Sequence, residues 1–188
     1  MMRNHDTCGT PAMIRLFFDI AMHRKGPQDV PAERGVFVFA LAAYLVAGGA
    51  VLWPSASGAR EMFGQLMLDL VVLVVVSAAL LAFTGHAARL GQTLAALFGT
   101  GALLSAAALP FVWVLASILG DGAAIPETIP TAAALSSIAL FGLLLASLLV
   151  TGHILRHALE WSYPAGVLAA TAYFAFSTFV FRSVFPVS

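Results

Sequence analysis

Five long apolar stretches constrain the fold of this 188-residue chain more than any other feature. A hydrocarbon core about 30 Å thick needs about 20 apolar residues of helix to cross it. The stretches cover residues 35–53, 66–83, 94–119, 131–155 and 165–185, and the connections between them are short. The pattern predicts an all-α, polytopic membrane helix bundle with five transmembrane helices, which form one domain over residues 35–188.

The composition excludes the common classes of soluble protein. Hydrophobic residues make up 61% of the chain and charged residues only 10%, whereas soluble domains carry about 25% charged residues. A globule of this size could not hide so much apolar surface from water. Nine basic residues balance nine acidic ones, so no positive field exists to hold a nucleic acid. The expected partner is therefore the lipid bilayer.

The basic residues predict the orientation of the bundle. Seven of the nine lie before the first span or in the second and fourth connections, namely Arg3, Arg15, Arg24, Lys25, Arg34, Arg89 and Arg156. Only Arg60 and Arg182 fall on the other side. The positive-inside rule then places the N-terminus in the cytoplasm and the C-terminus outside. A cleaved signal peptide fits poorly, because 34 residues would precede its apolar core.

Residues 13–34 form a cytoplasmic segment ahead of the first span. Its first part carries polar side chains at every fourth position: Arg15, Asp19 and His23. This period predicts a short amphipathic helix along the membrane interface, and a helix packed under the bundle fits the same period. Residues 1–12 are expected to be a disordered leader, and Met13 is an alternative start. Cys8 is the only cysteine and cannot form an intramolecular disulfide.

A short motif, T-G-H-x-x-R, ends both the second and the fourth span. Its two copies are Thr84, Gly85, His86 and Arg89, and then Thr151, Gly152, His153 and Arg156. A duplicated two-helix hairpin would produce such an echo. The alternative is that glycine and cationic side chains both suit the C-terminal end of a helix.

Three residues near the fourth connection are weak candidates for a metal site. His153, His157 and Glu160 have i, i+4, i+7 spacing, and the repeat could bring His86 to the same face. An ion pair in an aqueous loop explains the same spacing without a metal. Because no second carboxylate or thiol accompanies them, we expect no metal and no other cofactor.

Asp69 is the only acidic residue well inside an apolar stretch. Intramembrane ions are candidates for function. Asp69 follows the expected start of its span by a few residues, and Arg182 lies near the same side of the membrane. We therefore predict a structural Asp69–Arg182 ion pair near the outer interface. A proton relay is the alternative, and it would need further ionisable groups at depth.

Two features predict the shape and packing of the helices. Pro110 lies midway along the third span and should kink it, because proline removes one backbone hydrogen bond. Small residues at four-residue spacing should allow close helix contacts. These pairs are Ala43/Ala47, Gly101/Ser105, Ala102/Ala106, Gly142/Ala146 and Gly166/Ala170.

The third span and its approach carry a family resemblance. Residues 89–110, RLGQTLAALFGTGALLSAAALP, combine a polar turn with a Gly/Ala-rich helix that contains a proline. Together with the five spans, this resembles the bacterial branch of the Yip-one (YIPF-type) membrane domain over residues 14–185. The resemblance implies a bacterial inner-membrane protein with a cytoplasmic N-terminus and a periplasmic C-terminus. It transfers no catalytic residue.

The function expected from these features is that of a non-enzymatic scaffold or accessory subunit. No nucleophile elbow, phosphate-binding loop, zincin motif or dinucleotide fingerprint is present. Small-residue faces would serve contacts with other membrane proteins or a second copy. One alternative is a small-solute transporter or channel component, which requires polar groups at the midplane. Another is a membrane metalloprotein that uses the cytoplasmic histidines.

Overall fold

The computed structural model describes residues 9–119 and 129–185, so Cys8 and most of the loop before the fourth span lie outside it. Within those two ranges the chain forms six α-helices, three short 3-10 helices and no strand. The helices are α1 (Thr10–Ala21), α2 (Arg34–Leu52), α3 (Ala59–Phe83), α4 (Leu90–Leu119), α5 (Thr131–Leu159) and α6 (Tyr163–Val184). The predicted all-α class is confirmed, and α2 to α6 are each long and apolar enough to cross a membrane.

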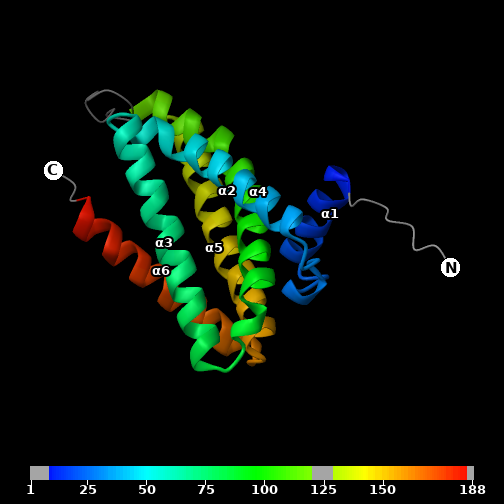
Figure 1. Ribbon diagram of the computed structural model, residues 1–188. Helices are drawn as coiled ribbons and strands as arrows, with labels where there is room; N and C mark the ends of the chain where they lie inside the picture. Colours follow the sequence, from blue (N-terminus) through cyan, green and yellow to red (C-terminus); the bar gives the residue numbers. More distant parts are fainter. Residues whose placement is uncertain (1–8, 120–128, 186–188) are drawn as a thin grey trace.

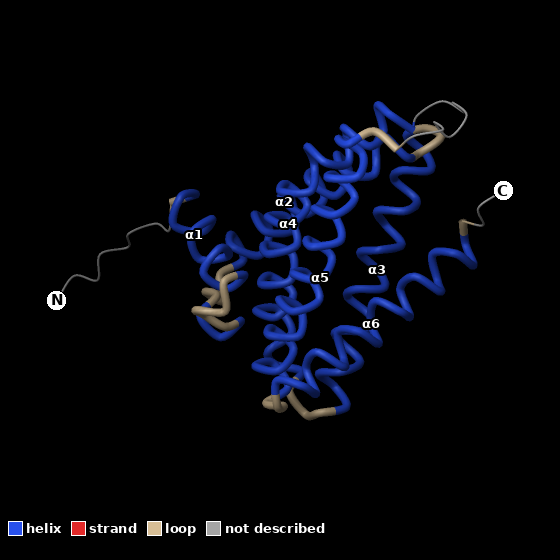
Figure 2. Tube along the Cα trace, turned by 180° about the vertical axis from the view of Figure 1, so that it is seen from behind, coloured by secondary structure: helices blue, strands red, loops and turns tan. Residues whose placement is uncertain are grey.

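Helix α4 lies at the centre of the bundle. It contacts α2 along one side and α5 along another, and α6 packs against α5. Helix α3 touches α2, α4 and α6. Figures 1 and 2 show the long helices as one bundle, with α1 at its edge near the N-terminus. The short turns after α3 and α5 meet at one end of the bundle, the lower end in Figure 1.

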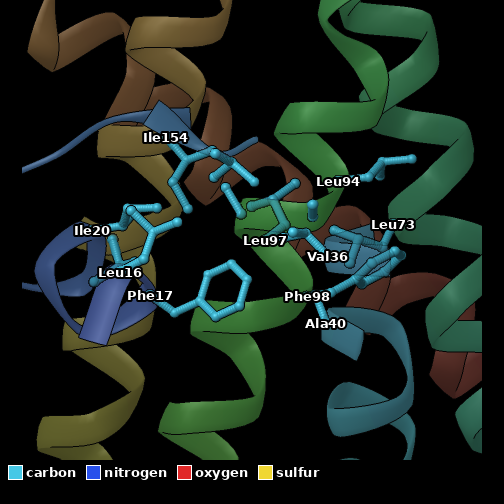
Figure 3. Close-up of a cluster of buried hydrophobic side chains, with 14 residues drawn as sticks. Leu16, Phe17, Ile20, Val36, Ala40, Leu73, Leu94, Leu97, Phe98 and Ile154 are labelled. Carbon is cyan, nitrogen blue, oxygen red and sulfur yellow. The ribbon is translucent and has the colours of Figure 1, made fainter. Parts of the chain in front are cut away.

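The main hydrophobic core joins α1, α2, α4 and α5. Phe98 of α4 is fully buried among Val36 and Ala40 of α2, and Ile154 of α5 closes the cluster on the other side. Figure 3 shows α1 delivering Leu16, Phe17 and Ile20 into this core. Because these residues are buried against protein, the N-terminal helix is part of the bundle and not a separate appendage.

Helix α1 has the features of both alternatives that its sequence period allows. One side is buried against the bundle, as the packed-helix alternative predicts. Its outer side exposes Ile14 and Phe18, and Met22 directly after the helix is exposed as well. These are the apolar residues that an interfacial helix would present to lipid. The helix begins at Thr10, before the expected Met13, because Pro11 suits the first turn of a helix.

Helix α3 begins seven residues before the expected Leu66, and the early start places Asp69 farther from the end of the helix than expected. The added first turns contain Arg60, Glu61 and Gln65, which are polar and therefore fall outside the apolar stretch that predicted the span. They are good helix formers. Glu61 also stabilises the helix start, since its carboxylate accepts hydrogen bonds from the backbone N–H (2.8 Å) and the hydroxyl of Ser57.

Glycines bring α5 and α6 into close contact. A methyl group added at Gly152 would lie 2.9 Å from the Cα of Val167, and Gly166 faces the Gly152 carbonyl at even closer range. The predicted Gly166/Ala170 pair is therefore buried inside this contact. The predicted Gly142 lies on the exposed side of α5, with no atom within 4 Å of the position that a methyl group would take.

Pro110 lies inside a continuous helix. Helix α4 runs on to Leu119, and the proline side chain is exposed. The proline therefore does not end the helix, and the kink that it should cause stays a prediction.

Candidate functional site

Asp69 lies deep in the bundle and not near the end at which α3 begins. It follows the first residue of α3 by ten positions, which is about 15 Å along the helix axis. Tyr44, Thr100 and Tyr173 likewise follow the first residues of α2, α4 and α6 by ten positions. The four residues therefore come from the middle sections of four different helices.

The carboxylate of Asp69 accepts a hydrogen bond from the hydroxyl of Tyr44. The Tyr44 ring is held in place by α4: its centroid lies 5.2 Å from that of Phe98, and a methyl group added at Gly101 would lie 2.9 Å from its Cε2 atom. Because glycine leaves room for the ring at this point, the phenol reaches across from α2 to α3.

The structure does not bring Asp69 and Arg182 together. Arg182 is exposed near the end of α6, nine residues beyond Tyr173, which corresponds to about 13 Å along the axis. The ion pairs among the described residues are Lys25–Asp19, His86–Glu160 and Arg89–Glu160, and Asp69 takes part in none of them. The early start of α3 explains the difference, because it places Asp69 deeper than the apolar stretch suggested.

A cavity of about 210 Å³ lies beside Asp69. All five long helices contribute to its lining, which mixes hydroxyl groups with aromatic and aliphatic side chains. The polar members are Tyr44, Asp69, Thr100, Ser105, Ser147, Thr151, Tyr173 and Ser177. Among the described residues that line the cavity, none is Lys, Arg or His. The cavity therefore has one acidic group and no basic group.

Some of the hydroxyl groups in the cavity are already committed as donors. Thr100 donates to the carbonyl of Ala96 at 2.7 Å, and Ser147 donates to that of Leu144 at 2.9 Å. Such bonds satisfy the hydrogen of a hydroxyl group in a membrane helix and leave its oxygen lone pairs free. These two oxygens can therefore accept a hydrogen bond from, or coordinate, a positively charged ligand.

Two of the predicted histidine candidates, His153 and His157, lie toward the C-terminal end of α5, where His153 follows the cavity residue Thr151 by two positions. The ring centroid of His153 is 4.5 Å from that of His23 and 4.7 Å from that of His157. His153 is buried, and its Nε2 atom lies 2.9 Å from the carbonyl oxygen of Lys25. The Nε2 atom of His23 lies 3.3 Å from the carbonyl oxygen of Leu149. These contacts fasten the end of the N-terminal segment to α5.

The described residues include no group of three or more His, Cys, Asp or Glu side chains arranged to hold a metal ion. Glu160 does not share a helical face with His153 and His157, because α5 ends at Leu159 and Glu160 has a left-handed φ of 57°. Its carboxylate instead accepts a 2.7 Å hydrogen bond from Arg89 and lies 3.7 Å from His86. The hydrogen bond and charge of Arg89 hold the pKa of Glu160 below its usual range, and His86 adds to this effect.

The two T-G-H-x-x-R copies adopt different conformations. In the first copy, Thr84 caps α3 and Gly85 has a φ of 79°, so the motif ends a helix. In the second copy, Gly152 and His153 are buried inside α5, which continues to Leu159. The helix-ending interpretation therefore describes the first copy, whereas the second copy serves packing between α5 and α6.

Sequence reasoning missed two tyrosines of the cavity, although the sequence contains a clue to them. Tyr in membrane helices is enriched at the interfaces, where its hydroxyl reaches water. Tyr44 and Tyr173 instead fall in the middle of their apolar stretches. A phenol at that depth needs a hydrogen-bonding partner inside the bundle.

Comparison with known proteins adds no assignment to this geometry. No protein-family model, no curated protein and no solved structure matches the chain.

Proposed function

We propose that this chain is a membrane carrier that binds a small monovalent cation at the midplane, with the Asp69 carboxylate as its binding group. The observation that carries the proposal is the position of Asp69 in a cavity that all five long helices line and to which no described residue contributes a positive charge. The scaffold hypothesis expects no polar groups at this depth, whereas a transporter requires them.

The energetics of a carboxylate at this depth in the bundle support a cationic ligand. A charged side chain at the centre of a membrane helix costs at least about 2.5–3.5 kcal/mol. The hydrogen bond from Tyr44 offsets part of this cost, since a hydrogen bond to a charged group contributes about 1.5–3 kcal/mol. A bound cation would offset the remainder by neutralising the charge directly.

The lining limits the class of cation. Ca²⁺ takes six to eight oxygen ligands and Mg²⁺ demands near-octahedral coordination, and a single carboxylate leaves either ion with uncompensated charge. A monovalent ion is matched by Asp69 alone. A small organic ammonium also fits, because Tyr44, Tyr173 and Phe174 line the cavity and aromatic rings attract cations.

The carrier is oriented in this proposal with its N-terminus in the cytoplasm. The support is the distribution of basic residues, with Arg89 and Arg156 at the end of the bundle where the turns after α3 and α5 meet. The cavity then lies between that cytoplasmic end and the outer ends of α2 and α4.

A scaffold or accessory subunit of the Yip-one type is the second candidate. It is favoured by an apolar groove of about 390 Å³ between α1, α2 and α4. Four predicted small residues line this groove, namely Ala43, Ala47, Ala102 and Ala106. In a Cys8→Ser background, an Ala47→Cys variant would crosslink to a second copy or another membrane protein under this hypothesis. Its failure to crosslink in native membranes would remove this support.

Cation binding is tested by the thermal stability of the purified protein in detergent. Unfolding is followed by the fluorescence of the three tryptophans in sodium, potassium or choline chloride, with N-methylglucamine chloride as the ionic-strength balance. A ligand at 100 times its dissociation constant stabilises the folded state by about 2.7 kcal/mol. For a chain of this size that corresponds to a rise in Tm of roughly 5–10 °C.

The controls for this experiment lie on the same helix. Asp69→Asn should abolish the rise in Tm, whereas Glu61→Gln should keep it, because Glu61 lies eight residues nearer the outer end of α3 and does not line the cavity. If none of the three salts raises the Tm of the wild-type protein, or if Asp69→Asn retains the full rise, the proposed function is wrong.

A further inference from the structure

The described groups that face Asp69 are uncharged, and none of them could form an ion pair with it. Helix α2 contributes Tyr44 and helix α6 contributes Tyr173, and these phenols are the only other titratable groups among the described residues that line the cavity. Helices α4 and α5 contribute only hydroxyl, glycine and apolar positions, such as Thr100 and Thr151. Phenols are neutral at physiological pH. No protein group on the described elements therefore balances a negative Asp69.

We propose that Asp69 exchanges one proton for one cation, so that the carrier couples cation binding to proton release. This inference rests on the proposed cation site and names its counter-substrate. A carboxylate this deep needs a positive partner. When the cation is absent, the proton is the partner that remains, because no Lys, Arg or His side chain among the described residues reaches the cavity.

The exchange step balances in atoms and charge. As the cation enters, the O–H bond of the Asp69 carboxyl group breaks and its proton passes to water. The carboxylate oxygen then binds the cation, so the cavity gains one positive charge and loses one. The site therefore stays neutral in both states, which avoids an uncompensated charge at any point of the cycle.

Tyr44 acts as a positioning residue in this exchange. Its hydroxyl donates to the Asp69 carboxylate and so favours the ionised form over the protonated one. Removal of this donor in Tyr44→Phe leaves the ring packed on Phe98 and Gly101 but makes the proton harder to displace. The variant should therefore bind cations more weakly, and the loss should be greatest at low pH.

The test counts protons during cation binding. Purified protein in weakly buffered detergent solution is titrated with sodium, potassium or choline chloride, and proton release is read from a pH-sensitive dye. We expect about one proton per bound cation. In the pH range where Asp69 is protonated in the empty site, the apparent cation affinity should fall about tenfold for each unit by which the pH is lowered. Glu61→Gln should behave like wild type, and Asp69→Asn should release no proton.

The outcomes separate this inference from the proposed function. Cation binding that depends on Asp69 but releases no proton, and whose affinity is independent of pH, overturns the exchange and leaves the cation site in place. Absence of any cation binding overturns both. If Asp69→Asn does not fold, Tyr44→Phe decides the question. Under the exchange, the cation affinity of Tyr44→Phe should begin to fall at a higher pH than that of the wild type. At a site without exchange, the cation affinity of both proteins is independent of pH.

Discussion

The contact between α5 and α6 allows a stability prediction from a single methyl group. In Gly166→Ala the new Cβ would lie 2.8 Å from the Cβ of Arg156 and 3.0 Å from its backbone nitrogen, and it would overlap the carbonyl oxygen of Gly152. Ordinary van der Waals contact begins at 3.4 Å. Because two of these three atoms belong to the backbone of α5, no side-chain rotation relieves the overlap, and the two helices must separate.

The matched control is Gly142→Ala, since no atom lies within 4 Å of the position of its new methyl group. Both substitutions gain about 1 kcal/mol of helix propensity, so this gain cancels when the two variants are compared. The difference isolates the cost of overpacking, which is about 1–3 kcal/mol. The backbone contacts favour the upper part of that range, so we expect Gly166→Ala to be about 2–3 kcal/mol less stable than Gly142→Ala.

The assay is reversible unfolding in mixed micelles with increasing sodium dodecyl sulfate, followed by tryptophan fluorescence. A thermal scan should show the same order, with a gap in Tm of roughly 4–12 °C between the two variants. Equal stability of Gly166→Ala and Gly142→Ala would refute the close α5–α6 contact, because an open position and a closed one cannot tolerate the same methyl group equally.

Three further predictions concern charge and orientation. In a double-mutant cycle of thermal stability, Tyr44→Phe and Asp69→Asn should couple by about 0.6–1.7 kcal/mol, as interhelical hydrogen bonds in membranes do. The stability changes caused by Arg182→Gln and Asp69→Asn should instead add. Because the pKa of Glu160 is lowered, its ion pair with Arg89 is fully formed above the usual pKa range of a carboxyl group and weakens as the pH falls through the lowered pKa. The Tm difference between wild type and Arg89→Gln should therefore shrink toward acid pH. A reporter that is active only outside the cytoplasm should work when fused to the C-terminus, and activity of a cytoplasm-only reporter there would contradict the orientation.

The number and type of the long helices follow from the sequence because apolar length is a direct physical requirement of the bilayer. Depth within a helix does not follow so simply. Polar but helix-forming residues such as Arg60 and Glu61 extend α3 beyond its apolar stretch, so Asp69 lies near the middle of the helix and not near its start.

Contacts between helices were the least predictable part of the site. The spacing of Asp69 along α3 contains no information about which helix lies opposite, and Tyr44 becomes its neighbour only because Gly101 leaves space for the ring on α4. The helical period of the N-terminal segment similarly predicted its amphipathic character. It could not predict that Phe17 packs against Gly99 of α4.

The docking of α1 has a consequence for the biogenesis of the protein. Helix α1 leaves the ribosome before any of the spans, yet His23 at its end contacts Leu149, 126 residues later in the chain. At a synthesis rate of about 5–20 residues per second, its final neighbours on α5 are made roughly 6–25 s after it. Until α4 and α5 have both been made, the protein surface that covers Leu16, Phe17 and Ile20 in the fold is incomplete. An amphipathic segment can bind to the membrane surface during this time, so α1 is made before the five long helices but reaches its final position only after α5 is made.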